Sequence, residues 1–164
     1  MKRTALQTLT LTALFAALAA ALTFVHIPFP MTSGGYVHPG DGVVYLAACL
    51  LPLPWGAVAA AIGCGVADLA APLWLPATLL IKPCMALFFS AKRERILCKR
   101  NALALLPAAL INAGGYFLYE GLALGQWAAL AGVLGNVLQS MIAAAIFVLL
   151  GAAMDRLRIK RRFL

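Results

Sequence analysis

Long apolar stretches run through this chain, and its basic residues lie almost entirely in three clusters beside them. The clusters occupy 2–3, 92–100 and 156–162, and Lys82 is the only Lys or Arg outside them. The first apolar run, 4–25, would be about 33 Å long as a helix, which is enough to cross a bilayer. Hydrophobic residues make up 64% of the chain and charged residues 11%, against about 25% charged in a typical soluble domain. This composition argues against a soluble enzyme, a nucleic-acid-binding module and a disordered segment, in spite of the net charge of +8.

The apolar runs predict an all-α membrane protein, a six-transmembrane-helix bundle that forms a single domain over 1–164. Lys and Arg concentrate on the cytoplasmic side of membrane proteins, so we expect the three clusters and both the N and C termini to be cytoplasmic. The three turns expected outside contain no Lys or Arg, which agrees with six spans. A cleaved signal peptide is the alternative for the first run, although such a peptide has a shorter apolar core. The predicted segments are 4–25, 42–51, 55–71, 75–91, 101–122 and 126–154.

Between the first two segments lies a loop, HIPFPMTSGGYVHPGD at 26–41, in which three prolines and three glycines prevent a regular helix. Loops of this length are uncommon in small proteins and are often lids or binding elements. The loop is expected on the outer face.

Two ionisable side chains, Asp68 and Lys82, fall within predicted spans. Such residues are costly in a bilayer and are often functional. Because a short Pro-bounded turn joins their segments, we expect the two side chains to approach each other in the outer half of the bundle. They could form a plain ion pair between helices, Lys82 could bind a polar or anionic ligand group, or Lys82 could extend towards the lipid headgroups.

Polar side chains on the last two segments are expected at the same depth. Asn112 and Tyr116 share one helix face because they are four residues apart, and Glu120 continues that face. Asn136 and Gln139 share a face of the next helix. These groups could only join helices to each other, or they could line a pocket open to the outside that suits a small planar molecule.

Small residues form two strips on the first segment, one with Ala13, Ala17 and Ala21 and one with Ala16 and Ala20. Spacing by four places each strip on one side of the helix and allows a second helix to approach closely. The strips could pack within the bundle or form a docking face for another membrane protein.

Signatures of catalysis are missing from the sequence: it contains no HExxH, GxSxG or phosphate-loop motif. We therefore expect no enzyme activity, no cofactor and no metal site. The cysteines show no metal-ligand spacing and are interpreted as small core residues; they are Cys49, Cys64, Cys84 and Cys98.

Four segments together resemble the substrate-binding S components of energy-coupling-factor (ECF) transporters. They are TALFAALAAALTF (12–24), GGYVHPGDGVVYLAACLL (34–51), AAAIGCGVADLAAP (59–72) and PATLLIKP (76–83). The GYxHxGD pattern resembles the subgroup with riboflavin-type, hydroxymethylpyrimidine-type and proposed queuosine-precursor carriers. Pro39 departs from this pattern, where an aliphatic residue is expected.

The resemblance implies a multi-pass protein of the bacterial plasma membrane that takes a small vitamin-like or nucleobase-like heterocycle from outside. A membrane-embedded T component would dock on the alanine strip, and two cytoplasmic ATPases would supply energy. A small oligomeric channel or exporter, or a structural membrane subunit, are the alternative functions.

Lys82 lies in a family motif and is the first candidate for ligand binding, while Asp41 is expected to cap the second helix. Aromatic side chains would form stacking walls. The predicted binding set is Lys82, Asp68, Tyr36, His38, Asn112, Tyr116, Asn136, Gln139 and Trp74, and the predicted docking set is Ala13, Ala16, Ala17, Ala20 and Ala21.

Overall fold

The computed structural model of the chain describes residues 4–28 and 35–160, so the basic residues at 2–3 and 161–162 lie outside the described part. Within these residues the chain is all-helical apart from one two-stranded antiparallel ribbon, which confirms the predicted class. The elements are α1 (Ala5–Phe24), β1 (Ile27–Pro28), β2 (Tyr36–Val37), α2 (Gly40–Leu50), α3 (Trp55–Asp68), α4 (Leu75–Ala86), α5 (Lys99–Ala123) and α6 (Gln126–Arg156).

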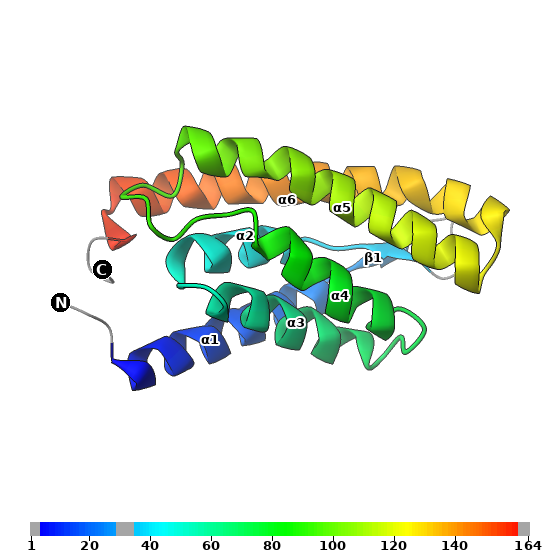
Figure 1. Ribbon diagram of the computed structural model, residues 1–164, viewed down its shortest axis with the longest axis horizontal. Coiled ribbons are helices and arrows are strands. Elements are labelled where there is room, and N and C mark those ends of the chain that lie inside the picture. The colour runs from blue at the N-terminus through cyan, green and yellow to red at the C-terminus, as the bar shows by residue number, and fades with distance from the viewer. Residues whose placement is uncertain (1–3, 29–34, 161–164) are drawn as a thin grey trace.

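The helices form an elongated bundle in which α1 packs on α3 and α5 lies beside α6 (Figure 1). Helices α2 and α4 fill the space between these pairs. The start of α1 and the end of α6 lie at one end of the bundle with the loop 87–98, and the α5–α6 turn lies at the other (Figure 1). Asp155 of α6 closes this loop by accepting the backbone N–H groups of Ile96 and Leu97 at 2.8 and 2.9 Å. The fold therefore brings the second basic cluster to the end where the described part of the third one lies.

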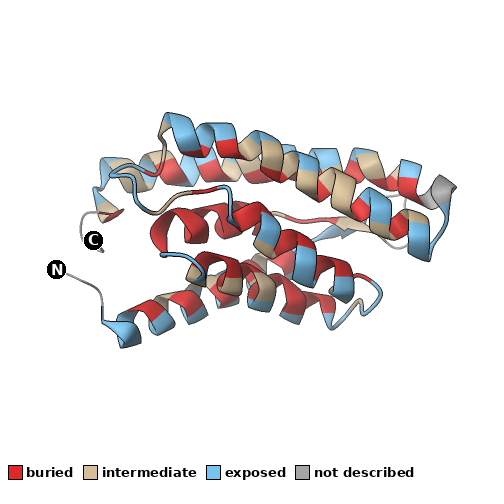
Figure 2. Ribbon diagram, in the orientation of Figure 1, coloured by how far each residue is buried: buried red, intermediate tan, exposed pale blue. Residues whose placement is uncertain are grey.

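Helix α2 is buried along its whole length, as Figure 2 shows. Its 11 residues give a helix of about 16 Å, roughly half the hydrocarbon thickness of a bilayer. Glycines permit its close contacts: a Cβ at Gly40 would collide with the Thr23 hydroxyl, and a Cβ at Gly42 would lie 2.6 Å from Ile146 Cγ2. The short helix predicted at 42–51 is confirmed, but it runs from Gly40 to Leu50 and is fully buried rather than half-buried.

Three helices within the described residues, α1, α5 and α6, are long and apolar enough to cross a membrane. Helices α2, α3 and α4 have only 11, 14 and 12 residues. The first and the last two predicted segments thus match long helices, whereas 55–71 and 75–91 end earlier than predicted, at Asp68 and Ala86. Six spans and cytoplasmic termini stay predictions.

The contact between α1 and α3 depends on Gly63. A Cβ at this position would lie 2.5 Å from the backbone oxygen of Ala16 and 2.8 Å from Ala19 Cβ. A backbone oxygen cannot rotate away as a side chain can, so any larger residue must push the two helices apart.

We expect Gly63→Ala to destabilise the protein by about 1–3 kcal/mol because it overpacks this contact. The measurement is the apparent unfolding temperature in detergent, which should fall. Gly114→Ala is the matched control, since a Cβ at Gly114 meets nothing within 4 Å; its unfolding temperature should stay the same or rise. Equal behaviour of the two variants would contradict the close α1–α3 contact.

Candidate functional site

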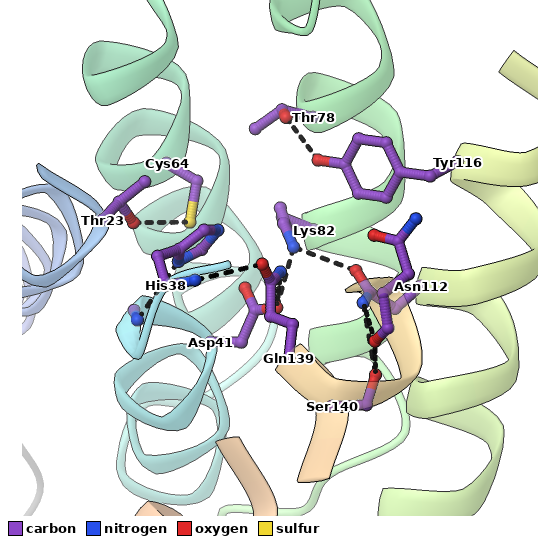
Figure 3. Close-up of polar contacts among 12 residues, drawn as sticks. Thr23, His38, Asp41, Cys64, Thr78, Lys82, Asn112, Tyr116, Gln139 and Ser140 are labelled. Carbon is purple, nitrogen blue, oxygen red and sulfur yellow. Dashed lines mark hydrogen bonds and ion pairs between the residues drawn. The ribbon is translucent and has the colours of Figure 1, made fainter. Parts of the chain in front are cut away.

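A Lys–Asp ion pair is buried at the centre of the bundle (Figure 3). Lys82 Nζ of α4 lies 2.8 Å from Asp41 Oδ2 of α2, and the two side chains are 1% and 0% exposed. Lys82 also donates to Asn112 Oδ1 of α5 at 3.0 Å, and Gln139 Nε2 of α6 donates to the same Asp41 oxygen at 2.8 Å. A buried charge is tolerated only when it is paired and hydrogen-bonded, so this network fixes four helices around one point.

Of the three alternatives for Lys82, a plain ion pair with Asp68 is wrong, because the partner is Asp41. The prediction that Asp41 caps α2 is also wrong. The helix begins at Gly40, its N-cap residue is Pro39, and no side-chain cap bond is present. Because Asp41 already lies within the first turn, its carboxylate reaches Lys82 instead of the backbone N–H groups.

Asp68 belongs to a second polar cluster, which joins α3 to β2, α4 and α5. Its two carboxylate oxygens accept hydrogen bonds from the hydroxyls of Tyr36 and Thr78. The Thr78 hydroxyl lies 2.6 Å from that of Tyr116; since Thr78 gives its proton to Asp68, Tyr116 is the donor. Burial and the hydrogen bond to Asp68 raise the pKa of Tyr36, which therefore stays a neutral donor.

His38 is held in the segment between β2 and α2. Its backbone N–H donates to Gln139 Oε1 at 3.3 Å, and its Nδ1 accepts the N–H of Gly40 at 3.2 Å. Burial lowers the pKa of His38 to about 4, so the imidazole is neutral near pH 7. The ring of Tyr36 lies between two imidazoles, with centroids 4.5 Å from His26 and 5.7 Å from His38.

Asn112 has a structural role in this network. Its Nδ2 donates to the backbone oxygen of Asn136 and to Ser140 Oγ, both at 3.2 Å, while its Oδ1 accepts from Lys82. These bonds join α5 to α6, as expected for an amide that holds membrane helices together.

The two clusters border a cavity of about 40 Å³, with room for two or three water molecules. Eight of the nine predicted binding residues line it, and Asn112 is the exception because it lies behind Lys82. Trp74 and Tyr116 form an aromatic wall, with ring centroids 6.3 Å apart. The lining residues are Thr23, Gly35, Tyr36, His38, Cys64, Asp68, Trp74, Lys82, Tyr116, Glu120, Gly132, Gly135, Asn136 and Gln139.

Several lining residues were not in the predicted set, among them Thr23, Cys64 and Glu120. Glu120 could have been found, because it continues the face of Asn112 and Tyr116. Thr23 and Cys64 carry no such signal, since an apolar helix with one hydroxyl or thiol gives no indication of the direction in which that group points.

A comparison with protein families shows which kind of protein contains this cavity. A family model described as "ECF-type riboflavin transporter, S component" matches residues 3–156. The chain belongs to this family. The S components are substrate-binding subunits of transporters and not enzymes, so the resemblance drawn from the sequence is confirmed. No curated protein matches the chain.

The S component has a second hollow, an apolar groove of about 420 Å³ between α1 and α3. Four residues of the predicted docking set line it, whereas Ala21 is exposed beside it. Ala16 is buried and packs against Gly63, so its role in helix packing is clear. The lining residues are Leu9, Thr12, Ala13, Ala16, Ala17, Ala20, Trp55, Val58, Ile62, Gly63 and Val66.

Removing one partner of the buried pair in this S component should be strongly destabilising, by about 3–5 kcal/mol, because the other charge stays buried and unpaired. We expect Lys82→Met and Asp41→Asn to show a coupling energy of at least about 2 kcal/mol in a double-mutant cycle. The measurement is the free energy of unfolding by denaturant titration in detergent.

The control cycle combines Lys82→Met with Asp68→Asn and should give a smaller coupling energy, since Asp68 binds Tyr36 and Thr78 instead. A larger coupling to Asp68 than to Asp41 would contradict the observed pairing.

Proposed function

We propose that this S component is the specificity subunit of an ECF-type importer, which binds a small vitamin-like or nucleobase-like heterocycle from outside the cell. The observation that supports this most directly is the cavity between the two polar clusters, where aromatic faces and hydrogen-bonding groups converge. Planar rings stack on aromatic side chains, and a few well-placed polar groups give specificity to a small-molecule site. The name of the matching family includes riboflavin, which is therefore one of the ligands to be tested.

The proposed topology has six spans in one domain, 1–164, with both termini in the bacterial cytoplasm. Large apolar side chains on the outer faces of α5 and α6 support contact with lipid: Leu103, Leu110 and Leu149 are 72%, 65% and 70% exposed. The basic segment 92–100 lies at the same end as the start of α1 and the end of α6, and the cavity is lined by residues near the opposite turns. This arrangement suits a site that faces outwards.

Binding requires the cavity to expand, because about 40 Å³ is less than a heterocyclic ring occupies. The Tyr36–Asp68 hydrogen bond is the contact that a ligand would displace, since both residues line the cavity.

The partners proposed for this S component are a membrane-embedded T component and two cytoplasmic ATPases. The α1–α3 groove is the proposed docking surface for the T component. Ala13 and Ala17 are its exposed members within the predicted set, and Gly63 forms its base. Small residues there leave space for the side chains of a partner helix.

We expect purified protein to carry one small heterocycle per chain, detected by native mass spectrometry. Trp74→Ala should reduce the bound fraction at least tenfold because it removes the cavity wall, and Trp74→Phe should restore most of it. Trp55→Ala, in the α1–α3 groove, is the matched control and should keep the ligand. Wild-type protein without any bound molecule, from cells that supply the ligand, would contradict the proposal.

Replacing Ala17 by Leu should fill the α1–α3 groove and reduce co-purification with the T component and ATPases at least tenfold, while ligand binding stays intact. Ala102→Leu adds the same volume at an exposed position of α5 and should have no effect. The measurement is affinity capture of the complete transporter, and normal capture of the Ala17→Leu variant would show that the groove is not the docking surface.

A further inference from the structure

The charges around the cavity indicate which kind of heterocycle it accepts. Three charged side chains line the cavity within the described residues: Lys82, Asp68 and Glu120. The positive charge of Lys82 is balanced by Asp41 directly behind it, at 2.8 Å. His38 also lines the cavity, but it is neutral near pH 7. The two acidic side chains, Asp68 and Glu120, are thus left without a compensating cation among the described residues.

Two of the three donors of Lys82 are already engaged. The ammonium group has three N–H bonds: one points to Asp41 and one to Asn112, and the nitrogen lies 5.1 Å from the centre of the Tyr116 ring. A ligand anion would have to displace the buried Asp41 carboxylate or approach across the Tyr116 face. One N–H of Lys82 is left for a ligand, and an anionic group there would lie close to the Asp41 carboxylate, which disfavours an anion at this position.

Glu120 faces into the bundle although it lies near the end of α5. It is 5% exposed, and a Cβ at Gly132 of α6 would collide with its carboxylate. Asn136 is its hydrogen-bond partner, and no Lys or Arg among the described residues pairs with it. Glycine at 132 thus provides the space for a carboxylate that the fold itself does not neutralise.

Asp68 is the second such group, and it accepts only neutral hydroxyl donors, from Tyr36 and Thr78. The rings of Trp74 and Tyr116 line the same cavity as these two acids. Aromatic faces attract cations, most strongly where water is excluded. Acidic groups and aromatic faces in one small site both favour a positively charged ligand.

We propose that the cavity selects a positively charged heterocycle, a flat ring that carries a protonated amine, with the amine directed to Glu120 or Asp68 and the ring against Trp74 and Tyr116. This inference rests on the proposed function and narrows its substrate class. A neutral ring such as riboflavin, or a ring with a carboxylate, is a weaker ligand in this account.

The test compares three pyrimidines that differ in one substituent: 4-amino-2-methylpyrimidine with a 5-aminomethyl, a 5-hydroxymethyl or a 5-carboxylate group, together with riboflavin. Isothermal titration of the purified full chain in detergent should give a dissociation constant at least tenfold lower for the aminomethyl compound than for the hydroxymethyl compound. The carboxylate should bind more weakly still. Equal or tighter binding of the hydroxymethyl compound, the carboxylate or riboflavin would overturn the proposal.

Glu120→Gln keeps the shape of the side chain and removes its charge. The variant should raise the dissociation constant of the aminomethyl compound at least tenfold and that of the hydroxymethyl compound less than threefold. A purely structural role of Glu120 would not change the selectivity in this way. Glu94→Gln, at the opposite end of the bundle, is the matched control and should change neither. Equal losses for both compounds would count against a charge-selective role of Glu120.

Native mass spectrometry separates the failure of this inference from that of the proposed function. If no compound binds and the co-purified molecule is neutral or anionic, the cation preference is wrong and the binding function stands. If none of the test compounds binds but the co-purified molecule carries a protonated amine, the preference for a cation is supported, with a ring other than the pyrimidine. If no compound binds and nothing co-purifies, both proposals fail.

Discussion

The buried pair of Lys82 and Asp41 is the interaction on which the rest of the structure depends. It lies where α2, α4, α5 and α6 meet, and both charges are removed from lipid and water. Two opposite charges in a low-dielectric interior stabilise one arrangement of their helices, because any other leaves a charge unpaired. Lys82 of this pair lines the cavity, and the cluster around Asp68 lines it as well.

The short buried helix α2 explains how so small a bundle contains a site at all. A longer helix in its place would fill the interior with side chains, whereas a helix that begins at Gly40 leaves room for the segment 35–38. This segment brings Tyr36 and His38 into the cavity lining. The cavity is thus built between a rigid half, formed by helices, and a loop that contacts it through a few polar groups.

Much of this could be predicted from the sequence, and the reason is physical. Apolar runs bounded by charge, proline and glycine predicted the position of each helix in the described residues. Because polar groups are costly in lipid, Lys82, Asp68 and Gln139 were expected in the interior, where they lie. What could not be predicted was the pairing. Asp41 and Lys82 are 41 residues apart, and only the path of the loop before α2 decides whether Asp41 caps a helix or enters the core. The predicted segment 75–91 was also longer than the helix α4, because apolar residues continue past Ala86 into a turn.

The most direct measurement is an experimental structure of the protein in lipid nanodiscs, purified with its native ligand. The account predicts density for a flat ring between Trp74, Asp68 and Glu120, above an intact Lys82–Asp41 pair, with Tyr36 displaced from Asp68. Ligand density outside this cavity, or a ring bound directly to the Lys82 ammonium with Asp41 displaced, would contradict it.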